Sequence, residues 1–260
     1  MRLFSLLSIL LFLFSCTLSN KTTTKSNEKK LIAAHGNMTD FKTITFPSKD
    51  GLTITGDLYS VKDSKNFILL CHQAGFSRGE YIEAAKKLNN LGYSCLAIDQ
   101  RSGKVANNVI NETAKLAKEK GLDTNYFDAK PDIDSAIDYA YKLHGNKIIL
   151  VGSSYSAALS LLIATTNDKV KAVAAFSPGE YLDGVNLTES ILALNKPTFV
   201  TSSKKEIEQV ASIIKNIKSK QVTHFKPEVD GIHGSRVLWK KTVGNKTYWK
   251  SFIDFLSSIE

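Results

Sequence analysis

The sequence predicts an α/β fold in which a mostly parallel sheet is covered by helices on both faces. Short apolar segments rich in β-branched residues alternate with longer segments whose apolar residues recur every three or four positions. This alternation is typical of parallel strands joined by crossover helices. The short segments show no polar face, which indicates a sheet buried on both sides. A chain of 260 residues can form one large domain or two small ones.

The first segments differ from this pattern and predict an antiparallel hairpin at the edge of the sheet. Residues 41–46 and 52–59 alternate apolar and polar side chains. Lys49, Asp50 and Gly51 lie between them and favour a tight turn.

The remaining elements alternate along the chain. We expect strands at residues 66–72, 93–99, 148–151, 170–177, 197–201 and 221–225. We expect helices at residues 80–91, 131–144, 157–167, 206–217 and 246–259, and a short helix within 101–129 that stops at Gly121. No internal repeat and no Pro- or Gly-rich linker follows residue 30, so residues 41–260 are expected to form one domain.

The net charge of +9 comes from lysines that are spread along the chain. There is no dense Lys/Arg block and no stripe of interleaved aromatic residues, so we expect a solvated basic surface and no nucleic-acid partner. Such a surface favours contact with anionic surfaces.

Residues 1–15 are expected to be a signal peptide. Arg2 supplies a positive start, and the apolar run at residues 3–14 has the length of a secretory core, too short to span a bilayer. Residues 13–16, Leu-Phe-Ser-Cys, resemble a bacterial lipobox, in which Cys16 is lipidated and becomes the mature N-terminus. The alternative is ordinary cleavage with Cys16 as a chance thiol, because Phe14 is bulkier than most lipoboxes carry.

Residues 16–40 are expected to be a tether, because residues 17–30 are polar and contain few apolar side chains. Together with the lipobox, this predicts a lipoprotein on the non-cytoplasmic side of a cell-envelope membrane, held there by an N-terminal lipid anchor.

Cys71 and Cys95 are expected to be buried free thiols. If their strands are parallel neighbours that end together, Cys95 lies about four residues below Cys71, far beyond disulfide reach at ~3.3 Å per residue. No Cys/His cluster has the spacing of metal ligands, so we expect no metal and no cofactor.

The chemistry is predicted at the end of the 148–151 strand. Gly152-Ser153-Ser154-Tyr155-Ser156 follows this strand directly and precedes a small, apolar helix, which is the layout of a nucleophile elbow centred on Ser154. The residues two before and two after the nucleophile must be small, and both are, although Ser156 replaces the usual Gly. The alternative is that Gly and Ser simply fill a turn.

The order of hairpin, strand with His-Gln-Ala-Gly at 72–75, strand followed by Asp-Gln-Arg at 99–101, elbow and two later loops resembles the α/β-hydrolase fold. Within that fold the chain is most similar to dienelactone-hydrolase-like and prolyl-oligopeptidase-like serine hydrolases. The resemblance implies a catalytic triad in the chain order Ser, acid, His.

His233 is the expected general base, because it is the histidine that lies in a Gly-rich loop after the last strand. The others fit worse: His35 lies in the tether, His72 precedes the nucleophile, His144 ends a helix, and His224 lies inside a strand.

The acid is implied to lie in the loop after the 197–201 strand, where Glu206 is the first carboxylate. Its alternative role is a solvated Glu that the helix dipole favours at a helix start. Asp183, after the preceding strand, is the substitute acid used by some relatives.

The oxyanion hole is implied to use the backbone N–H groups of Ala74 and Tyr155. Ala74 lies in the segment that resembles the family's His-Gly-x-Gly motif, with Gln73 in place of a Gly. Arg101 is expected to brace loops, as in many relatives, rather than to bind a substrate carboxylate.

These features predict a serine hydrolase that forms an acyl-enzyme and acts on a small-molecule acyl substrate, with carboxylic esters as the expected class. Two alternatives remain: a peptidase, although no propeller or other gating domain is visible, and an inactive hydrolase fold that serves as a surface binding protein. Reaction with a fluorophosphonate would separate an enzyme from a binding module.

Overall fold

The structure is a computed structural model that describes residues 41–259. The predicted signal peptide, the lipidation site Cys16 and the predicted tether lie outside the described residues.

The described residues contain an eight-stranded sheet in the order β1-β2-β4-β3-β7-β8-β9-β10. Its strands are β1 (Lys42–Pro47), β2 (Thr53–Tyr59), β3 (Phe67–Cys71), β4 (Ser94–Ile98), β7 (Ile148–Ser153), β8 (Val170–Phe176), β9 (Thr198–Thr201) and β10 (Val222–Phe225). The β1–β2 and β2–β4 pairs are antiparallel, and every other pair is parallel. The predicted hairpin at the edge of a mostly parallel sheet is therefore confirmed.

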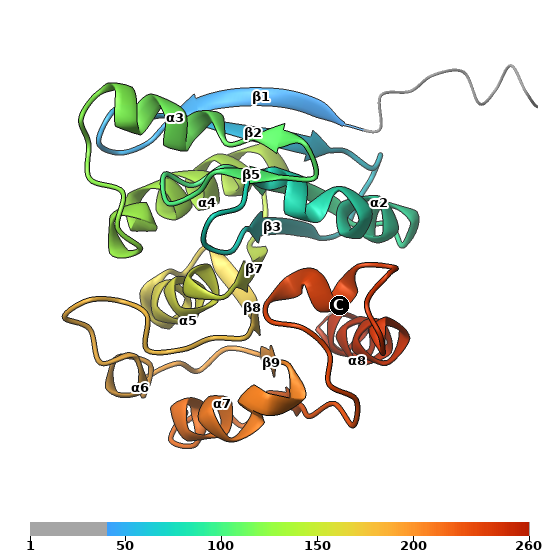
Figure 1. Ribbon diagram of the computed structural model, residues 1–260. Coiled ribbons are helices and arrows are strands. Elements are labelled where there is room, and N and C mark those ends of the chain that lie inside the picture. The colour runs from blue at the N-terminus through green and yellow to red at the C-terminus, as the bar shows by residue number, and fades with distance from the viewer. Residues whose placement is uncertain (1–40, 260) are drawn as a thin grey trace, which may run out of the picture. The chain divides into compact units, whose positions relative to one another are not determined.

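Helices cover both faces of this sheet (Figure 1). The longer ones are α2 (Ile82–Asn90), α3 (Glu112–Glu119), α4 (Lys130–His144), α5 (Tyr155–Thr166), α7 (Ile207–Ile214) and α8 (Asn245–Ser258). Apolar side chains of α4, α5 and α7 form one core with the sheet, and those of α2 and α8 form the other. Burial of apolar area on both faces is the main force that holds these layers together.

The segment 101–129 contains more structure than the one helix expected there. It forms a small ribbon of β5 (Val105–Ala106) and β6 (Val109–Ile110) before α3, and η2 (Phe127–Ala129) after it. Strands of two residues are too short to show a period of two. Their turn is made by Asn107 and Asn108, both at positive φ, a conformation that Asn tolerates better than most residues. A short helix, α6 (Leu187–Ser190), likewise lies within the expected connection 180–195.

The thiols of Cys71 and Cys95 are free and buried, as expected. Cys71 is aligned with Ile98 and Cys95 with Ile68, so the two cysteines are offset by three residues rather than four. Burial raises the pKa of both thiols, which keeps them protonated and unreactive.

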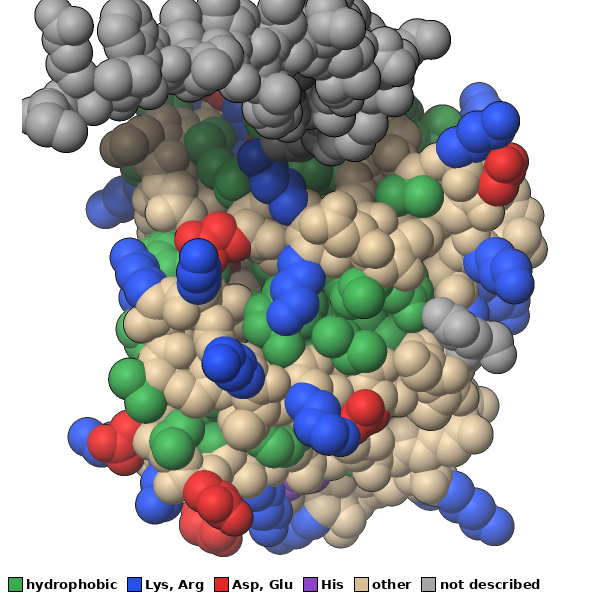
Figure 2. Space-filling model, turned by 90° about the vertical axis from the view of Figure 1, so that its right-hand side faces the viewer, with side chains coloured by type: hydrophobic (Ala, Val, Ile, Leu, Met, Phe, Trp, Pro, Cys, Tyr) green, Lys and Arg blue, Asp and Glu red, His purple; other side chains and the backbone are tan. Residues whose placement is uncertain are grey.

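No helix within 41–259 has the length and apolarity to cross a membrane. No group of three or more His, Cys, Asp or Glu residues in that range could hold a metal ion. On the face where α2 and α8 lie, Lys and Arg side chains are scattered among acidic and apolar ones (Figure 2).

The parallel strands bring several loops to one edge of the sheet. The carboxyl ends of β3, β7, β8, β9 and β10 point the same way. The segments that follow them are therefore neighbours in space although they are far apart in sequence, and ligands of open α/β sheets bind at this edge.

Candidate active site

Ser154 lies on a sharp turn between β7 and α5. Its backbone has φ 60° and ψ −121°, a conformation that non-Gly residues rarely adopt. The turn is held by the Ser154 N–H, which donates to the Phe176 carbonyl at 2.8 Å. The strand, the turn centred on Ser154 and the helix that the sequence predicted are all present.

The residues around Ser154 explain how the turn is tolerated. A Cβ atom on Gly152 would lie 2.3 Å from the Ser156 carbonyl oxygen, so no other residue fits there. Ser156, which replaces the usual Gly, adds bonds to the turn: its hydroxyl accepts from the Ser153 N–H at 2.9 Å and donates to the Cys71 carbonyl at 2.8 Å. The elbow is thereby tied to the end of β3.

His233 contacts Glu206, with 2.5 Å between Nδ1 and Oε1. Glu206 ends η3 (Lys204–Glu206), the turn between β9 and α7, and His233 lies in the loop that follows β10. Asp183, the alternative acid, is exposed, and within residues 41–259 it forms no ion pair with a histidine. Of the two candidate carboxylates, Glu206 is the one that the structure brings to His233.

The second oxygen of Glu206 holds the carboxylate in place. Oε2 accepts from the Ser203 N–H at 3.0 Å, the Ser203 hydroxyl at 2.6 Å and the Ser177 hydroxyl at 2.9 Å. The pair Ser203–Glu206 is a capping box, so Glu206 also has the helix-start role that was its alternative. One oxygen serves the helix start and the other serves His233.

Hydrogen bonds outweigh burial in setting the charge of Glu206. Burial raises its pKa, but hydrogen bonds from His233, Ser203 and Ser177 and attraction to His233 lower it to about 2. The ionised carboxylate can only accept, which places a proton on His233 Nδ1 and leaves Nε2 as the acceptor.

His72 holds the backbone of residues 72–75, which are called the oxyanion loop after the role expected for Ala74. Its Nε2 accepts from the Gln100 N–H at 3.0 Å, so Nδ1 carries the proton and donates to the Gln73 carbonyl at 2.8 Å. Burial lowers the pKa of His72 to about 4, although its hydrogen bonds to Gln73 and Gln100 oppose this, so the ring is neutral. Because a trans peptide points its C=O and N–H in opposite directions, the next N–H, that of Ala74, is directed away from His72.

The two N–H groups implied as oxyanion donors are available. Among the described residues, neither the Ala74 N–H nor the Tyr155 N–H has an assigned hydrogen-bond partner. Tyr155 is the first residue of α5, whose first N–H groups lack partners within the helix. Its ring is buried and stacks on Tyr126 at 4.7 Å between centroids.

The loop that carries His233 is fastened beside the nucleophile. The Gly234 N–H donates to the Ser177 hydroxyl at 3.0 Å, and the Ser235 N–H donates to the Ser153 hydroxyl at 2.8 Å. Ser177 therefore joins the acid to the histidine loop. Sequence reasoning missed it, because a Ser before Pro178 reads as the end of a strand.

Tyr181 lies near both members of the expected nucleophile–base pair. Its ring meets the His233 imidazole edge-on, with 6.4 Å between centroids. Burial and the charge of Glu206 raise the pKa of the Tyr181 phenol, whereas a hydrogen bond to Ser154 lowers it. In the described part of the chain, no hydrogen bond joins Ser154 to His233 directly.

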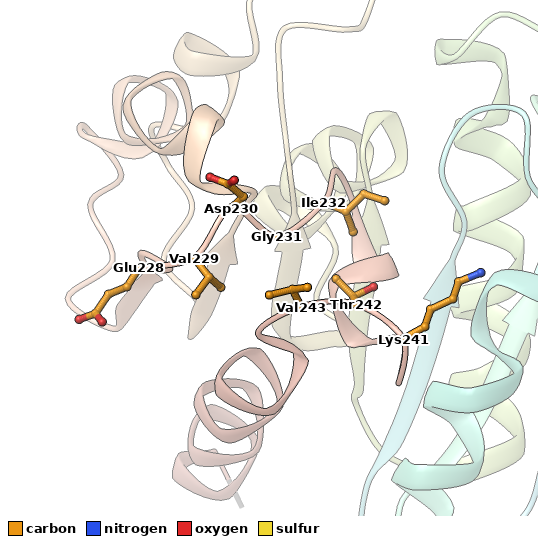
Figure 3. Close-up of a pocket in the computed structure, with 8 residues that line it drawn as sticks. All are labelled: Glu228, Val229, Asp230, Gly231, Ile232, Lys241, Thr242 and Val243. Carbon is orange, nitrogen blue, oxygen red and sulfur yellow. The ribbon is translucent and has the colours of Figure 1, made fainter.

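Two cavities adjoin these loops. A cavity of about 410 Å³ includes Ala74 in its lining, together with Arg101, Lys104 and Tyr126, and so reaches the oxyanion loop. A second, of about 720 Å³, lies between residues 228–232 and 241–243 (Figure 3). Its lining touches the histidine loop through Ile232. Neither lining includes Ser154, and the first cavity is the one that reaches Ala74, a residue expected to serve the reaction centre.

Arg101 braces loops, as expected. Its Nε and Nη2 bind the buried carboxylate of Asp132 at 2.6–3.2 Å, and Nη2 also pairs with Asp50 at 2.6 Å. These contacts hold the segment after β4 to α4 and to the β1–β2 turn, and they leave the guanidinium occupied by protein carboxylates.

Known proteins resemble this chain in sequence and in fold. Residues 58–225 match the dienelactone hydrolase family. An esterase of Pyrococcus furiosus aligns with a TM-score of 0.68 and 17% identity, over 86% of this chain and 96% of that one. A putative dienelactone hydrolase from Klebsiella pneumoniae aligns with a TM-score of 0.62 and 13% identity, over 84% of this chain and 96% of that one.

A dienelactone hydrolase from Anabaena variabilis aligns with a TM-score of 0.61 and 14% identity, over 84% of this chain and 96% of that one. No curated protein matches the chain. At these identities the structural likeness shows the α/β-hydrolase fold. The match at 58–225 covers more than half of the chain, and the protein belongs to the dienelactone hydrolase family.

Proposed function

We propose that this hydrolase is a serine esterase in which Ser154 is the nucleophile, His233 the general base and Glu206 the acid that orients the base. The observation that carries the proposal is the contact of His233 Nδ1 with Glu206 Oε1, in a loop that is hydrogen-bonded to Ser153, the residue before the strained Ser154. An inactive binding protein would not need a carboxylate at His233, and in this proposal Glu206 supplies the acid of an active triad.

The proposed reaction begins with attack of Ser154 Oγ on the carbonyl carbon, while its proton passes to His233 Nε2. The carbonyl oxygen becomes an oxyanion that accepts hydrogen bonds from the N–H groups of Ala74 and Tyr155. The tetrahedral intermediate expels the alcohol, which takes the proton from His233. Water then attacks the acyl-enzyme by the same steps and frees Ser154.

Glu206 keeps the proton of His233 on Nδ1 throughout and stabilises the imidazolium that forms. Hydrogen bonds between nucleophile and base are often long in unliganded enzymes and tighten in the substrate complex.

Carboxylic esters are the proposed substrates. The cavity at Ala74 is lined by Arg101, Lys104 and Tyr126 rather than by apolar side chains alone, which suits a small or polar acyl group. Hydrolysis of p-nitrophenyl esters with acyl chains of two to twelve carbons, each compared with Ser154→Ala, tests this. We expect activity that requires Ser154 and falls for the long chains; absence of hydrolysis across the series would refute the proposal.

The proposed setting is a cell-envelope membrane to which the domain is tethered through a lipid on Cys16. The support is the sequence of residues 1–16 alone, an apolar run that ends in Leu-Phe-Ser-Cys. Fractionation of cells that express the full chain or Cys16→Ala tests this proposal separately from the catalytic one.

A further inference from the structure

Glu80 is a fully buried carboxylate that the proposed reaction does not use. It lies in η1 (Arg78–Tyr81), the turn between the oxyanion loop and α2, and none of its surface is exposed. An ionisable group is seldom buried in this way unless partners satisfy it.

The partners of Glu80 come from three loops of the site. Oε2 accepts from the Gln73 N–H at 2.8 Å. Oε1 accepts from the Ser153 hydroxyl at 2.8 Å and from the Ser235 hydroxyl at 2.6 Å. Gln73 directly precedes the oxyanion donor Ala74, Ser153 directly precedes the nucleophile, and Ser235 follows His233 by two positions.

All three partners donate, so the site is built for the ionised form of Glu80. Burial raises the pKa of Glu80, and the hydrogen bonds from Ser235, Gln73 and Ser153 oppose that rise. A backbone N–H cannot reverse its role, and the Ser153 hydroxyl already accepts from the Ser235 N–H at 2.8 Å. A carboxylate can satisfy every one of these donors, whereas an amide brings a donor of its own.

The histidine loop is consequently held by two carboxylates. Glu206 binds His233, and Glu80 binds Ser235. Gly234 between them permits the close approach, because a Cβ there would lie 2.5 Å from Gln73 Oε1 and 2.6 Å from Ser153 Oγ. The histidine loop therefore contacts both the oxyanion loop and the elbow, and the Glu80 carboxylate bonds all three segments.

We propose that Glu80 is a positioning residue of the esterase. By joining three loops, it fixes the positions of the oxyanion donor, the nucleophile and the base relative to one another. It touches no reacting atom. Its effect on the rate comes through Ala74, Ser154 and His233, and a displacement of about 1 Å among such groups can cost ~10²-fold in rate. This inference rests on the proposed function.

The test is Glu80→Gln in the full chain, with kcat divided by the number of sites titrated with a fluorophosphonate. The amide must place its NH₂ group against the Gln73 N–H or against the two hydroxyls, so part of the junction breaks in either orientation. We expect kcat per titrated site to fall at least tenfold while KM changes less than threefold. Dividing by titrated sites excludes unfolded protein from kcat. If Glu80 only stabilised the fold, Glu80→Gln would lower the number of titrated sites and leave kcat per site unchanged.

Asp57→Asn is the matched control. Asp57 is 1% exposed and pairs with Thr43 and with Arg78 of η1, but it bonds none of Gln73, Ser153 and Ser235, the partners of Glu80. We expect it to lower the melting temperature and leave kcat per titrated site unchanged. Ser235→Ala, which deletes one hydroxyl of the junction, should lower kcat per site at least threefold and keeps the test decisive if Glu80→Gln does not fold.

The inference is overturned if Glu80→Gln keeps kcat per site within twofold of the parent. If Glu80→Gln does not fold, the same result in Ser235→Ala overturns it. Either result leaves the proposed function standing, because the parent enzyme still turns over and Ser154→Ala does not. A parent enzyme that neither hydrolyses esters nor reacts with the probe overturns the function and this inference together.

Discussion

Glu206→Gln separates the two roles that the structure gives to this side chain. The carbonyl oxygen of Gln can take the place of Oε2, where it still accepts from the Ser203 N–H and from the hydroxyls of Ser203 and Ser177. The NH₂ group then faces His233 Nδ1, where the carboxylate oxygen was. It donates to Nδ1, moves the ring proton to Nε2, and removes the acceptor that Ser154 needs.

The rate loss is expected to be large. In the serine-protease template the corresponding change, Asp to Asn, lowers kcat about 10⁴-fold because the catalytic histidine takes the wrong tautomer. We predict that Glu206→Gln lowers kcat at least ~10²-fold and changes KM little. An ester assay at neutral pH, normalised by active-site titration, measures both values.

The stability loss is expected to be small by comparison. Lowering of the Glu206 pKa from 4.5 to about 2 corresponds to about 3 kcal/mol at neutral pH. Gln keeps the bonds to Ser203 and Ser177, so we expect a loss of ~1 kcal/mol, or ~2–4 °C in melting temperature.

Glu180→Gln is the matched control for that experiment. Glu180 accepts from the N–H groups of Leu187 and Thr188 and from the Thr188 hydroxyl at the start of α6, but it has no histidine partner. It should leave kcat unchanged. If Glu206→Gln keeps kcat within a few-fold of the parent, Glu206 is only a helix cap and the reasoning from its geometry is refuted.

Four further predictions remain, three from the contacts of the site and one from the sequence of residues 1–16. Ser154→Ala should abolish ester hydrolysis with an unchanged circular dichroism spectrum, and retained turnover would sink the mechanism. Asp183→Asn should leave kcat unchanged, because Asp183 is exposed; a ~10²-fold loss would move the acid to that residue. Acid titration followed by urea unfolding should show stability from Glu206 that is complete above pH 4.5 and disappears as the pH falls through about 2, and Glu206→Gln should flatten that part of the curve. Cys16→Ala should move the protein from the membrane to the soluble fraction; unchanged partitioning would rule out the lipid anchor.

The sequence was most informative where structure is local. The strand, turn and helix around Ser154 occupy consecutive residues, so small neighbours and a change of periodicity were enough to predict the elbow. The hairpin and the alternation of buried strands with helices were predicted for the same reason. The ribbon β5–β6 was not predicted, because two strands of two residues each are too short to show a periodic pattern.

The site was only partly predictable, because its contacts are long-range. Glu206 fits the capping-box pattern with Ser203, and only the resemblance to α/β-hydrolases, not a local pattern, implied that its other oxygen reaches a histidine 27 positions later. Glu80 reads as an ordinary Glu before a helix, yet it meets Ser153 and Ser235. The order of strands in the sheet, rather than any local pattern, places these groups together.

The central claim is that Ser154 is an activated nucleophile. The most direct measurement is the reaction of the full chain with a fluorophosphonate, followed by mass spectrometry of the intact protein and of its peptides. The account predicts one phosphonyl group per chain, located on Ser154, with ester hydrolysis lost in proportion to labelling. An unlabelled protein, or a label on another residue with hydrolysis unchanged, would contradict it.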